Sequence, residues 1–460
     1  LAVGDSRARG RFTLRAGESA GFALEHRSRL EAAPREWTQE TIAVRLEDTV
    51  EAWRSWADMH QRYEGPWREL VHHSGRVLQA LTYQPTGAII AAPTTSLPEV
   101  VGGERNWDYR YTWLRDASLT LEALWVAACP DEAERYFDFL TSAMTQMSRG
   151  RDLQIMYGIG GEHDLTEREL PHLAGWRGSR PVRVGNGAWR QRQLDVYGEV
   201  LAAAHRLWEQ LDTLDVQGKR FLVALADTAA DRWGEPDQGI WELRGEPRHH
   251  LYSKLMCWVA VDRALEMARL LEAGEERVAR WRRVRRDIRE AILEHGFNER
   301  VGAFTQSFDS EVLDASALML PIVGFLPADE PRMRATLEAI ESGLTDERGL
   351  VYRYQGEDGL EVEEVTFLLC TFWLAQAYAL AGEVERAREA FSRAVEYVND
   401  VGLLAEEVEP ESGELLGNFP QAFSHIGLVN AAWAITQAEE RRGTRGGAVY
   451  APSPSGRGLG

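Results

Sequence analysis

Two glutamates in separate loops have neighbours that suit acid–base chemistry. Glu242 directly follows Trp241, and a carboxyl group beside an indole ring is partly desolvated, which favours the protonated form that acts as an acid. Glu406 follows the apolar run 403–405, which we expect to draw it inward. One protonated and one ionised carboxyl group are what acetal hydrolysis requires, because the first protonates the leaving oxygen while the second activates water or attacks carbon. Taken singly, each glutamate is more often a solvated loop residue.

The segment 106–116 offers a candidate sugar-binding surface. Its eleven residues contain four aromatic rings, two arginines and two aspartates, and they run directly into a helical pattern. Aromatic faces cover the C–H side of a sugar ring, while charged groups bind its hydroxyls. With Arg115 and Asp116 at the start of the helix, the segment suits a neutral polyhydroxylated ligand. The structural alternative is a buried aromatic corner with an Arg–Asp pair that caps the helix.

Charge and composition also favour a neutral ligand. The chain of 460 residues carries a formal net charge of −20, and a field of that sign repels phosphate backbones and anionic lipids. We therefore expect no nucleic-acid partner and no membrane partner; the oligomeric state stays open. The 16 tryptophans are many for this length, and a surplus of indole rings suits a carbohydrate cleft.

Cysteine and histidine usage gives no sign of a disulfide framework or a metal site. Cys129, Cys257 and Cys370 each lie in an apolar run and resemble small buried hydrophobic residues, which favours a reducing, cytoplasmic location. The sequence contains no run of about 18 apolar residues, so we expect no membrane-spanning helix. Zinc-ligand spacings and a phosphate-binding Gly-x-x-x-x-Gly-Lys motif are both missing, so we expect no metal and no other cofactor.

The elements that must position these residues are almost all helices. Apolar spacing predicts about twelve of them, over 66–82, 115–128, 131–148, 191–210, 215–233, 251–271, 275–296, 312–323, 329–344, 365–381, 384–399 and 420–440. Short turns with glycine or proline join several into antiparallel hairpins. About six such hairpins that close on themselves form an (α/α)6 toroid, so the predicted fold class is all-α.

The N-terminal and C-terminal parts are expected to differ from the toroid. Strand-like stretches at 10–15 and 20–25 predict a hairpin that ends a β domain whose start is absent. The predicted boundaries are 1–32 for this β remnant, 33–65 for a helical linker, 66–441 for the toroid and 442–460 for a disordered tail. Four long loops, at 149–190, 234–250, 345–364 and 400–419, are expected to gather at one end of the toroid and to be functional.

Several motifs, in this order along the chain, resemble glycoside hydrolase family 15, which includes glucoamylases, glucodextranases and trehalases. The motifs lie at 106–118, 239–242, 251–265 and 417–425, and the resemblance spans residues 35–440. It implies an (α/α)6 toroid (a six-hairpin glycosidase) with its site at the loop-rich end. In prokaryotic members a β-sandwich and a helical linker precede the toroid, so residues 1–32 would be the C-terminal remnant of that β-sandwich.

The resemblance also implies an inverting mechanism, with Glu242 as general acid and Glu406 as general base acting on water. Two departures bear on it. Fungal members carry a second glutamate after the acid that helps to bind the next sugar, and this chain has Leu243 followed by Arg244 there. Some members place a hydroxyl side chain near the base where this chain has Gly417, so the base would be less restrained.

The same resemblance implies the substrate contacts. Arg115 and Asp116 would hold hydroxyls of the non-reducing terminal glucose. Tyr109 would lie near the base, and Trp113 and Trp241 would line the pocket.

These observations favour an exo-acting inverting α-glucoside hydrolase that releases glucose from trehalose or short α-glucans. Trehalose and maltooligosaccharides both stay open as substrates, as do the linkage preference and the pH optimum. Two alternatives remain: a disaccharide phosphorylase that uses phosphate in place of water, and a non-catalytic sugar-binding toroid. The second carboxylate, Glu406, argues against the phosphorylase.

Overall fold

A computed structural model describes residues 2–4, 7–25, 36–128, 132–145, 153–208, 215–356 and 365–445. The chain divides after Gln61 into two compact units, one from Leu1 to Gln61 and one from Arg62 to Gly460. Residues 442–445 of the predicted disordered tail are helical, and residues 446–460 lie outside the described residues, as does the stretch 26–35 near the predicted boundary of the linker.

The first unit holds a small hairpin and a long helix. Strands β1 (Ala2–Gly4) and β2 (Arg7–Arg9) pair in an antiparallel ladder, and helix α1 (Gln39–His60) starts at a capping box formed by Thr38 and Thr41. No residue of α1 is buried.

The predicted strands at 10–15 and 20–25 are wrong: both stretches lack strand structure. The backbone of Gly21 instead forms two hydrogen bonds with a side chain of α1. Its N–H donates to Gln39 Oε1 at 2.7 Å, and its carbonyl accepts from Gln39 Nε2 at 2.9 Å. The two stretches meet through the rings of Phe12 and Phe22, whose centroids lie 4.9 Å apart.

The second unit is built from helices that follow the sequence prediction closely. They are α2 (Arg68–Ala80), α3 (Leu114–Ala127), α4 (Glu132–Thr145), α5 (Val196–Arg206), α6 (Val216–Arg232), α7 (Leu251–Glu266), α8 (Glu275–His295), α9 (Met319–Ile322), α10 (Pro331–Gly343), α11 (Leu368–Leu380), α12 (Val384–Val395) and α13 (Ala422–Arg445). The largest difference lies at 312–323. There the 3-10 helix η3 (Ala315–Leu318), capped by Asp314, leads into the short α9 in place of one continuous helix.

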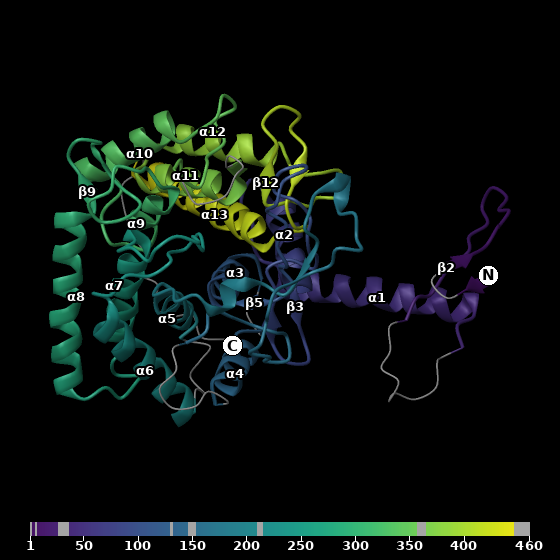
Figure 1. Ribbon diagram of the computed structural model, residues 1–460, viewed down its shortest axis with the longest axis horizontal. Helices are drawn as coiled ribbons and strands as arrows, with labels where there is room; N and C mark the ends of the chain where they lie inside the picture. The colour runs from purple at the N-terminus through teal and green to yellow at the C-terminus, as the bar shows by residue number, and fades with distance from the viewer. Residues whose placement is uncertain are drawn as a thin grey trace. The chain divides into compact units, whose positions relative to one another are not determined.

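Six of these helical segments form a closed inner ring. In order, α3, α5, α7, η3 with α9, α11 and α13 contact one another, and α13 contacts α3 to complete the circle. The helices between them in sequence pack outside, as α8 does beside α7 in Figure 1. The unit is therefore an (α/α)6 toroid, which confirms the predicted fold.

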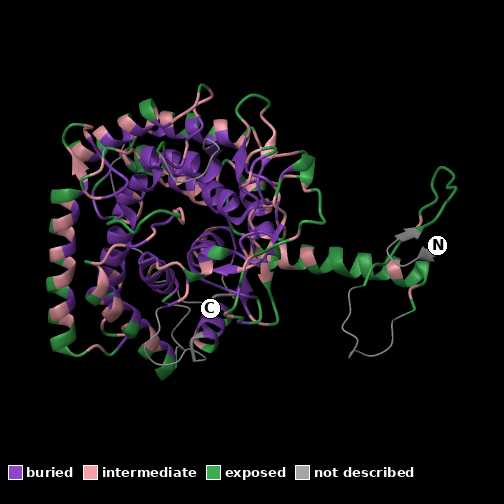
Figure 2. Cartoon of the chain, viewed as in Figure 1, coloured by how far each residue is buried: buried purple, intermediate pink, exposed green. Residues whose placement is uncertain are grey.

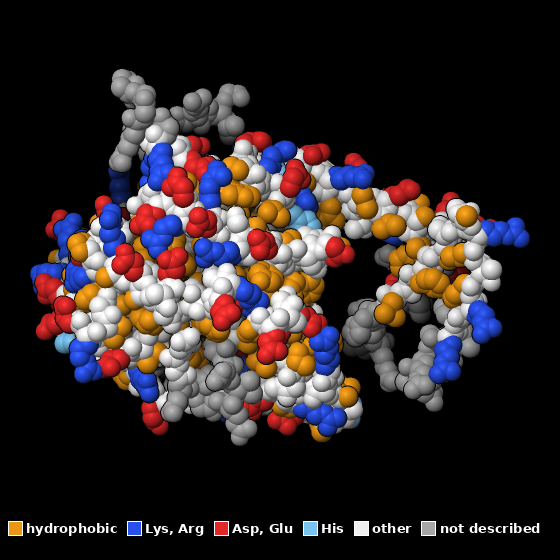
Figure 3. Space-filling model, turned by 90° about the horizontal axis from the view of Figure 1, so that it is seen from above, with side chains coloured by type: hydrophobic (Ala, Val, Ile, Leu, Met, Phe, Trp, Pro, Cys, Tyr) orange, Lys and Arg blue, Asp and Glu red, His pale blue; other side chains and the backbone are white. Residues whose placement is uncertain are grey.

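Burial explains which helices lie inside the ring. The inner helix α7 buries residues on all sides, including Lys254 and Asp262, whereas the outer helix α8 buries Trp281, Ile288 and Ile292 alone (Figure 2). An inner helix has neighbours all round and needs apolar residues on every face, while an outer helix needs one apolar stripe. On the face shown in Figure 3, Asp and Glu side chains alternate with Lys and Arg. Within the described residues, no helix is both long and apolar enough to cross a bilayer.

Short strands stiffen the long loops. Three of them, β11 (Thr366–Phe367), β12 (Glu407–Val408) and β13 (Leu415–Leu416), form an antiparallel sheet, and β5 (Thr112–Trp113) pairs with β6 (Met156–Tyr157). The other pairs are β3 (Thr82–Tyr83) with β4 (Ala88–Ile89), β7 (Arg168–Glu169) with β8 (Arg183–Val184), and β9 (Phe297–Asn298) with β10 (Ala303–Phe304). Both β5 and β12 adjoin candidate site residues, so these ladders fix the backbone where the site is built.

Candidate active site

The four long loops meet at one cavity of about 460 Å³. Each loop contributes to its wall, through Glu167, Gln238, Arg353 and Glu406 among others. The wall also contains every residue that the sequence singled out for catalysis or binding, namely Tyr109, Trp113, Arg115, Asp116, Trp241, Glu242 and Glu406. Residues from distant parts of the chain therefore line one cavity.

A tight turn presents Glu242 to the cavity. Its N–H donates to the carbonyl of Gly239 at 3.3 Å, and both residues have left-handed backbones, with φ of 71° at Gly239 and 59° at Glu242. Such a conformation costs a non-glycine residue about 1–3 kcal/mol and is found mostly at functional sites. Trp113 Nε1 donates to Glu242 Oε1 at 2.7 Å, and Arg115 Nη2 donates to the same oxygen at 3.4 Å. The side chain remains 21% exposed, so it is reachable from the cavity.

Arg115 and Asp116 lie in the first turn of α3, at the floor of the cavity. Arg115 is buried, and its Nη1 donates to Gln193 Oε1 at 3.2 Å and to the carbonyl of Ile240 at 3.0 Å. Burial raises the pKa of Asp116 to about 7, although the positive charge of Arg115 opposes the rise. Asp116 Oδ2 is buried and accepts no hydrogen bond from a described residue. A free acceptor beside a fixed cation suits a ligand hydroxyl.

Glu406 is placed by the sheet that begins at the next residue. The N–H of Leu368 donates to the carbonyl of Glu406 at 3.1 Å, which ties this residue to β11 and β12. Tyr109 Oη donates to Glu406 Oε1 at 2.9 Å, and Gln421 Nε2 donates to the same oxygen at 3.4 Å. The other oxygen, Oε2, accepts no hydrogen bond among the described residues. One oxygen is therefore held in place by two donors, whereas the other is buried without a donor among the described residues.

The electrostatics of Glu406 favour a strong base. Burial and, second to it, the charge of Glu99 raise the pKa of Glu406 well above its usual value. The charge of Arg353 and the hydrogen bond from Tyr109 act in the opposite direction. A raised pKa has two consequences for a general base. The ionised carboxylate takes a proton from water more readily, but a higher pH is needed to ionise it.

Trp241 forms a fixed wall of the cavity. Its indole Nε1 donates to Asp314 Oδ1 at 3.0 Å and to Oδ2 at 2.9 Å. Its ring packs against Phe367 and Trp373, with centroids 5.8 and 6.0 Å away. Because Asp314 also caps η3 of the inner ring, the wall is anchored to the toroid itself.

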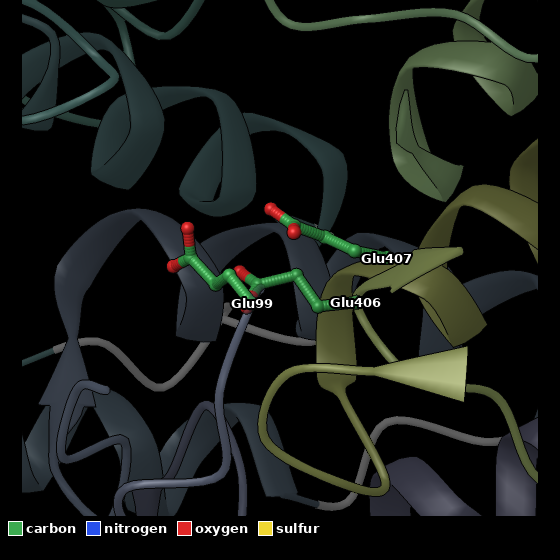
Figure 4. Close-up of side chains that lie close together, drawn as sticks. All are labelled: Glu99, Glu406 and Glu407. Carbon is green, nitrogen blue, oxygen red and sulfur yellow. The ribbon is translucent and has the colours of Figure 1, made fainter. Parts of the chain in front are cut away.

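The candidate base belongs to a cluster of three glutamates, and the other two were not singled out from the sequence. One oxygen each of Glu99, Glu406 and Glu407 lies within 4.8 Å of the others, and Figure 4 shows the side chains side by side. Arg353 Nη2 donates to Glu99 Oε2 and to Glu407 Oε1, both at 3.1 Å. In the sequence Glu99 and Arg353 have no motif around them, so only folding reveals them. This is the one group of possible metal ligands among the described residues; Arg353 already supplies its cation, and we assign no metal to it.

The rim of the cavity differs from the pattern expected of fungal relatives. Leu243 and Arg244 both line it, and the Arg244 guanidinium lies 4.5 Å from the centre of the Trp107 ring. Arg244 also lies 3.9 Å from Glu167, which forms a closer ion pair with Arg183 at 3.1 Å. Leu243 thus stands where a second glutamate would follow the acid in a fungal enzyme, and the next residue places a cation against an aromatic ring.

The segment 417–425 contributes amide groups and a core histidine. Gln421 contacts the base, and Asn418 Nδ2 donates to the carbonyl of Trp107 at 2.8 Å. His425 lies buried outside the cavity wall, where the N–H of Leu404 donates to its Nε2 at 3.2 Å, and burial lowers its pKa to about 3. His425 is therefore a neutral core residue and no part of the candidate site.

Together these groups can carry out acid–base chemistry on a neutral polyhydroxylated ligand. One carboxyl group is held by an indole and a guanidinium, and the other by a phenol and an amide. Aromatic rings and a buried Arg–Asp pair line the same cavity. A free oxygen on the buried carboxyl group suits activation of water.

Comparisons with known proteins identify the family of the chain. The sequence profile of "Glycosyl hydrolases family 15" matches residues 65–433. The chain is 43% identical to a trehalase from Mycolicibacterium smegmatis over 452 residues, which is 97% of this chain and 66% of that protein. It is 39% identical to a trehalase from Thermoplasma acidophilum over 87% of this chain and 68% of that protein. The chain thus spans just under two thirds of the mycolicibacterial relative.

Solved structures show the same architecture. A bacterial glucoamylase complexed with acarbose matches with a TM-score of 0.66 at 17% identity, covering 88% of this chain and 63% of that chain. A glycosidase in complex with glucose matches with a TM-score of 0.61 at 20% identity, covering 80% of this chain and 96% of that chain. At these identities the likeness concerns the fold.

Proposed function

Because the chain belongs to glycoside hydrolase family 15, we propose that it hydrolyses α-glucosidic bonds and releases glucose from the non-reducing end of its substrate. The observation that carries the proposal is the pair of held carboxyl groups, Glu242 and Glu406, on the wall of one cavity. The trehalases among its relatives point to trehalose or another short α-glucoside as the substrate.

In the proposed reaction Glu242 is the general acid and Glu406 is the general base. Glu242 gives its proton to the glycosidic oxygen as the bond from that oxygen to the anomeric carbon breaks. Glu406 takes a proton from a water molecule whose oxygen bonds to the opposite face of the same carbon, so the configuration inverts. Water is consumed, and the two carboxyl groups regain their starting states by exchange with solvent.

The residues around the pair bind and orient the reacting glucose. Arg115 and Asp116 hold its hydroxyls from the floor of the cavity, where Asp116 keeps an oxygen free of protein donors. Trp113 and Trp241 cover its C–H faces, while Tyr109 fixes the base through its hydrogen bond to Glu406. A buried charged pair is already desolvated before the ligand binds, so its hydrogen bonds to hydroxyls are strong.

Cavity size supports a short substrate. A volume of about 460 Å³ lies toward the small end of the range of roughly 300–1,000 Å³ found for small-molecule sites. Arg244 and Trp107 at the rim leave a polar, cationic surface for the leaving group. We place trehalose first and maltooligosaccharides second.

The proposed location is the cytoplasm, and the proposed partner is a neutral disaccharide or oligosaccharide. Cys257 is a buried free thiol, which suits a reducing compartment. The net charge of −20 disfavours polyanionic partners.

Glucose-release assays on trehalose, maltose and isomaltose test the proposal. We expect release from at least one of them without added phosphate. Inactivity on all three would refute the hydrolase, and strict dependence on phosphate with glucose 1-phosphate as the product would establish the phosphorylase instead.

A further inference from the structure

Glu99 is a buried carboxyl group beside Glu406 for which the proposed reaction has no direct use. Its side chain is 2% exposed, and its backbone N–H donates to the carbonyl of Arg105 at 3.1 Å. Oε2 of Glu99 accepts a hydrogen bond from Arg353 Nη2 at 3.1 Å, whereas Oε1 is buried and accepts none from a described residue. The side chain is thus held at the cavity wall with one oxygen unsatisfied.

The charges that face Glu406 are mostly negative. They belong to Glu99 and Glu407, within 4.8 Å of it, to the more distant Asp116 and to the cation Arg353. The neutral donors Tyr109 and Gln421 complete its surroundings. Arg353 is shared, because the same nitrogen bonds Glu99 and Glu407. One guanidinium therefore bonds two of the three clustered carboxyl groups, Glu99 and Glu407.

Such an arrangement acts on the base in a definite direction. Arg353 Nη2 donates a charge-assisted hydrogen bond to Glu99 Oε2, which holds the Glu99 carboxylate beside the base. A neighbouring carboxylate then makes it harder for Glu406 to lose its proton. By Brønsted behaviour, a group that binds its proton more tightly is the better general base once it is ionised.

We propose that Glu99 is a positioning residue for the general base: its carboxylate, held by Arg353 beside Glu406, increases the proton affinity of Glu406. The inference rests on the proposed hydrolysis and adds to it a residue that acts through Glu406. Glu407 lies in the same cluster, but its sheet position in β12 gives it a structural task as well. Glu99 lies outside the strands and is the cleaner test.

The test is the pH dependence of kcat/KM for glucose release by the wild-type protein and by Glu99→Gln. Removing the charge weakens the base, so we expect the midpoint of the acidic limb to fall by about one pH unit. The plateau at higher pH should fall by about tenfold or less. If the substitution instead damaged the site in general, kcat/KM at high pH would fall while the midpoint of the acidic limb would not move to lower pH.

Glu104→Gln is the matched control, because it makes the same chemical change on the same loop but outside the cavity wall. Its acidic limb should coincide with that of the wild type. If Glu99→Gln does not fold, Glu99→Asp keeps the charge but withdraws it by about 1.5 Å, and a smaller downward shift is expected. If the wild type is active and the acidic limb of neither Glu99 variant differs from that of the wild type, the role of Glu99 is overturned while the proposed function stands. A wild type inactive on all three glucosides would remove the proposed function and this inference with it.

Discussion

Tyr109 and Trp113, four residues apart in one segment, each donate a hydrogen bond to a different candidate catalytic glutamate. Tyr109 Oη lies 2.9 Å from Glu406 Oε1, and Trp113 Nε1 lies 2.7 Å from Glu242 Oε1. The two rings pack edge to face, with centroids 5.7 Å apart. One short segment therefore holds both carboxyl groups, so a change in either ring should alter the chemistry as well as the binding.

Replacing the proposed acid should abolish most of the turnover. For Glu242→Gln we expect kcat to fall by about 10²–10⁴-fold with a modest change in KM, because a positioned proton donor is lost while most sugar contacts remain. Steady-state glucose release measures both constants. Glu246→Gln, at an exposed position of the same loop outside the cavity wall, should keep wild-type kinetics. Equal activity in both variants would favour a non-catalytic sugar-binding toroid.

Removing the Tyr109 hydroxyl, which holds Glu406, should move the acidic limb of the pH profile of kcat/KM to higher pH. The hydrogen bond from Tyr109 lowers the pKa of Glu406, so its loss in Tyr109→Phe leaves that pKa still higher. A base must be ionised, and activity should therefore disappear at a higher pH as the solution is acidified. The pH profile of kcat/KM checks this, and a limb that stayed in place or moved downward would contradict it. The shift is opposite in sign to that expected for Glu99→Gln.

Gly417 lies so close to Glu406 that a side-chain methyl group at this position would crowd the base. A Cβ there would lie 2.9 Å from Glu406 Cβ and 3.1 Å from its Oε2, and the backbone φ is 84°. The position is thus tightly packed against the base, whereas the sequence led us to expect a less restrained base. Gly417→Ala should lower both stability, by about 1–3 kcal/mol, and kcat.

Gly382→Ala separates these two effects. Its φ is 79°, but nothing lies within 4 Å of an added Cβ. It should lose stability to a similar degree and keep wild-type kcat. Thermal unfolding and steady-state kinetics on both variants decide, and equal losses of kcat would show that the contact with Glu406 has no catalytic effect.

Buried Asp116 should make the protein less stable as the pH rises. Its pKa is raised from 3.8 to about 7, chiefly by burial, so the folded state binds the proton more tightly than the unfolded state. The stabilisation is complete below pH 3.8 and is lost as the pH rises through about 7. Asp116→Asn should flatten the pH dependence of thermal unfolding in that window. Asp309→Asn, where the side chain is 82% exposed, should not, and parallel profiles for all three proteins would contradict the assignment.

The helical fold could be predicted because its signals are local. The apolar faces of α7 and α11, and the glycine turn at Gly382 between α11 and α12, appear in the sequence itself. The predicted strands at 10–15 and 20–25 failed because the backbone of Gly21 found its partner in a side chain 18 residues away. Backbone pairing of a short strand depends on contacts that a local pattern does not contain.

Residues of the cavity wall that lie in motifs could be named from the sequence, whereas residues that stand alone could not. Tyr109, Trp113, Arg115 and Asp116 share one segment, and folding places them on the same wall as both glutamates. The contact of Arg353 with Glu99 joins residues 254 positions apart, and neither has a distinctive neighbour. Their effect on the base is electrostatic and arises only from the three-dimensional arrangement.

The anomeric form of the first products tests the central claim most directly. Proton NMR of trehalose hydrolysis, recorded before mutarotation, distinguishes the two outcomes. If Glu242 protonates the bond while Glu406 activates water on the opposite face, the attacked ring leaves as β-glucose and the other ring as α-glucose, in equal initial amounts. Release of α-glucose alone would mean retention of configuration, and it would contradict an acid and a base acting through one water molecule.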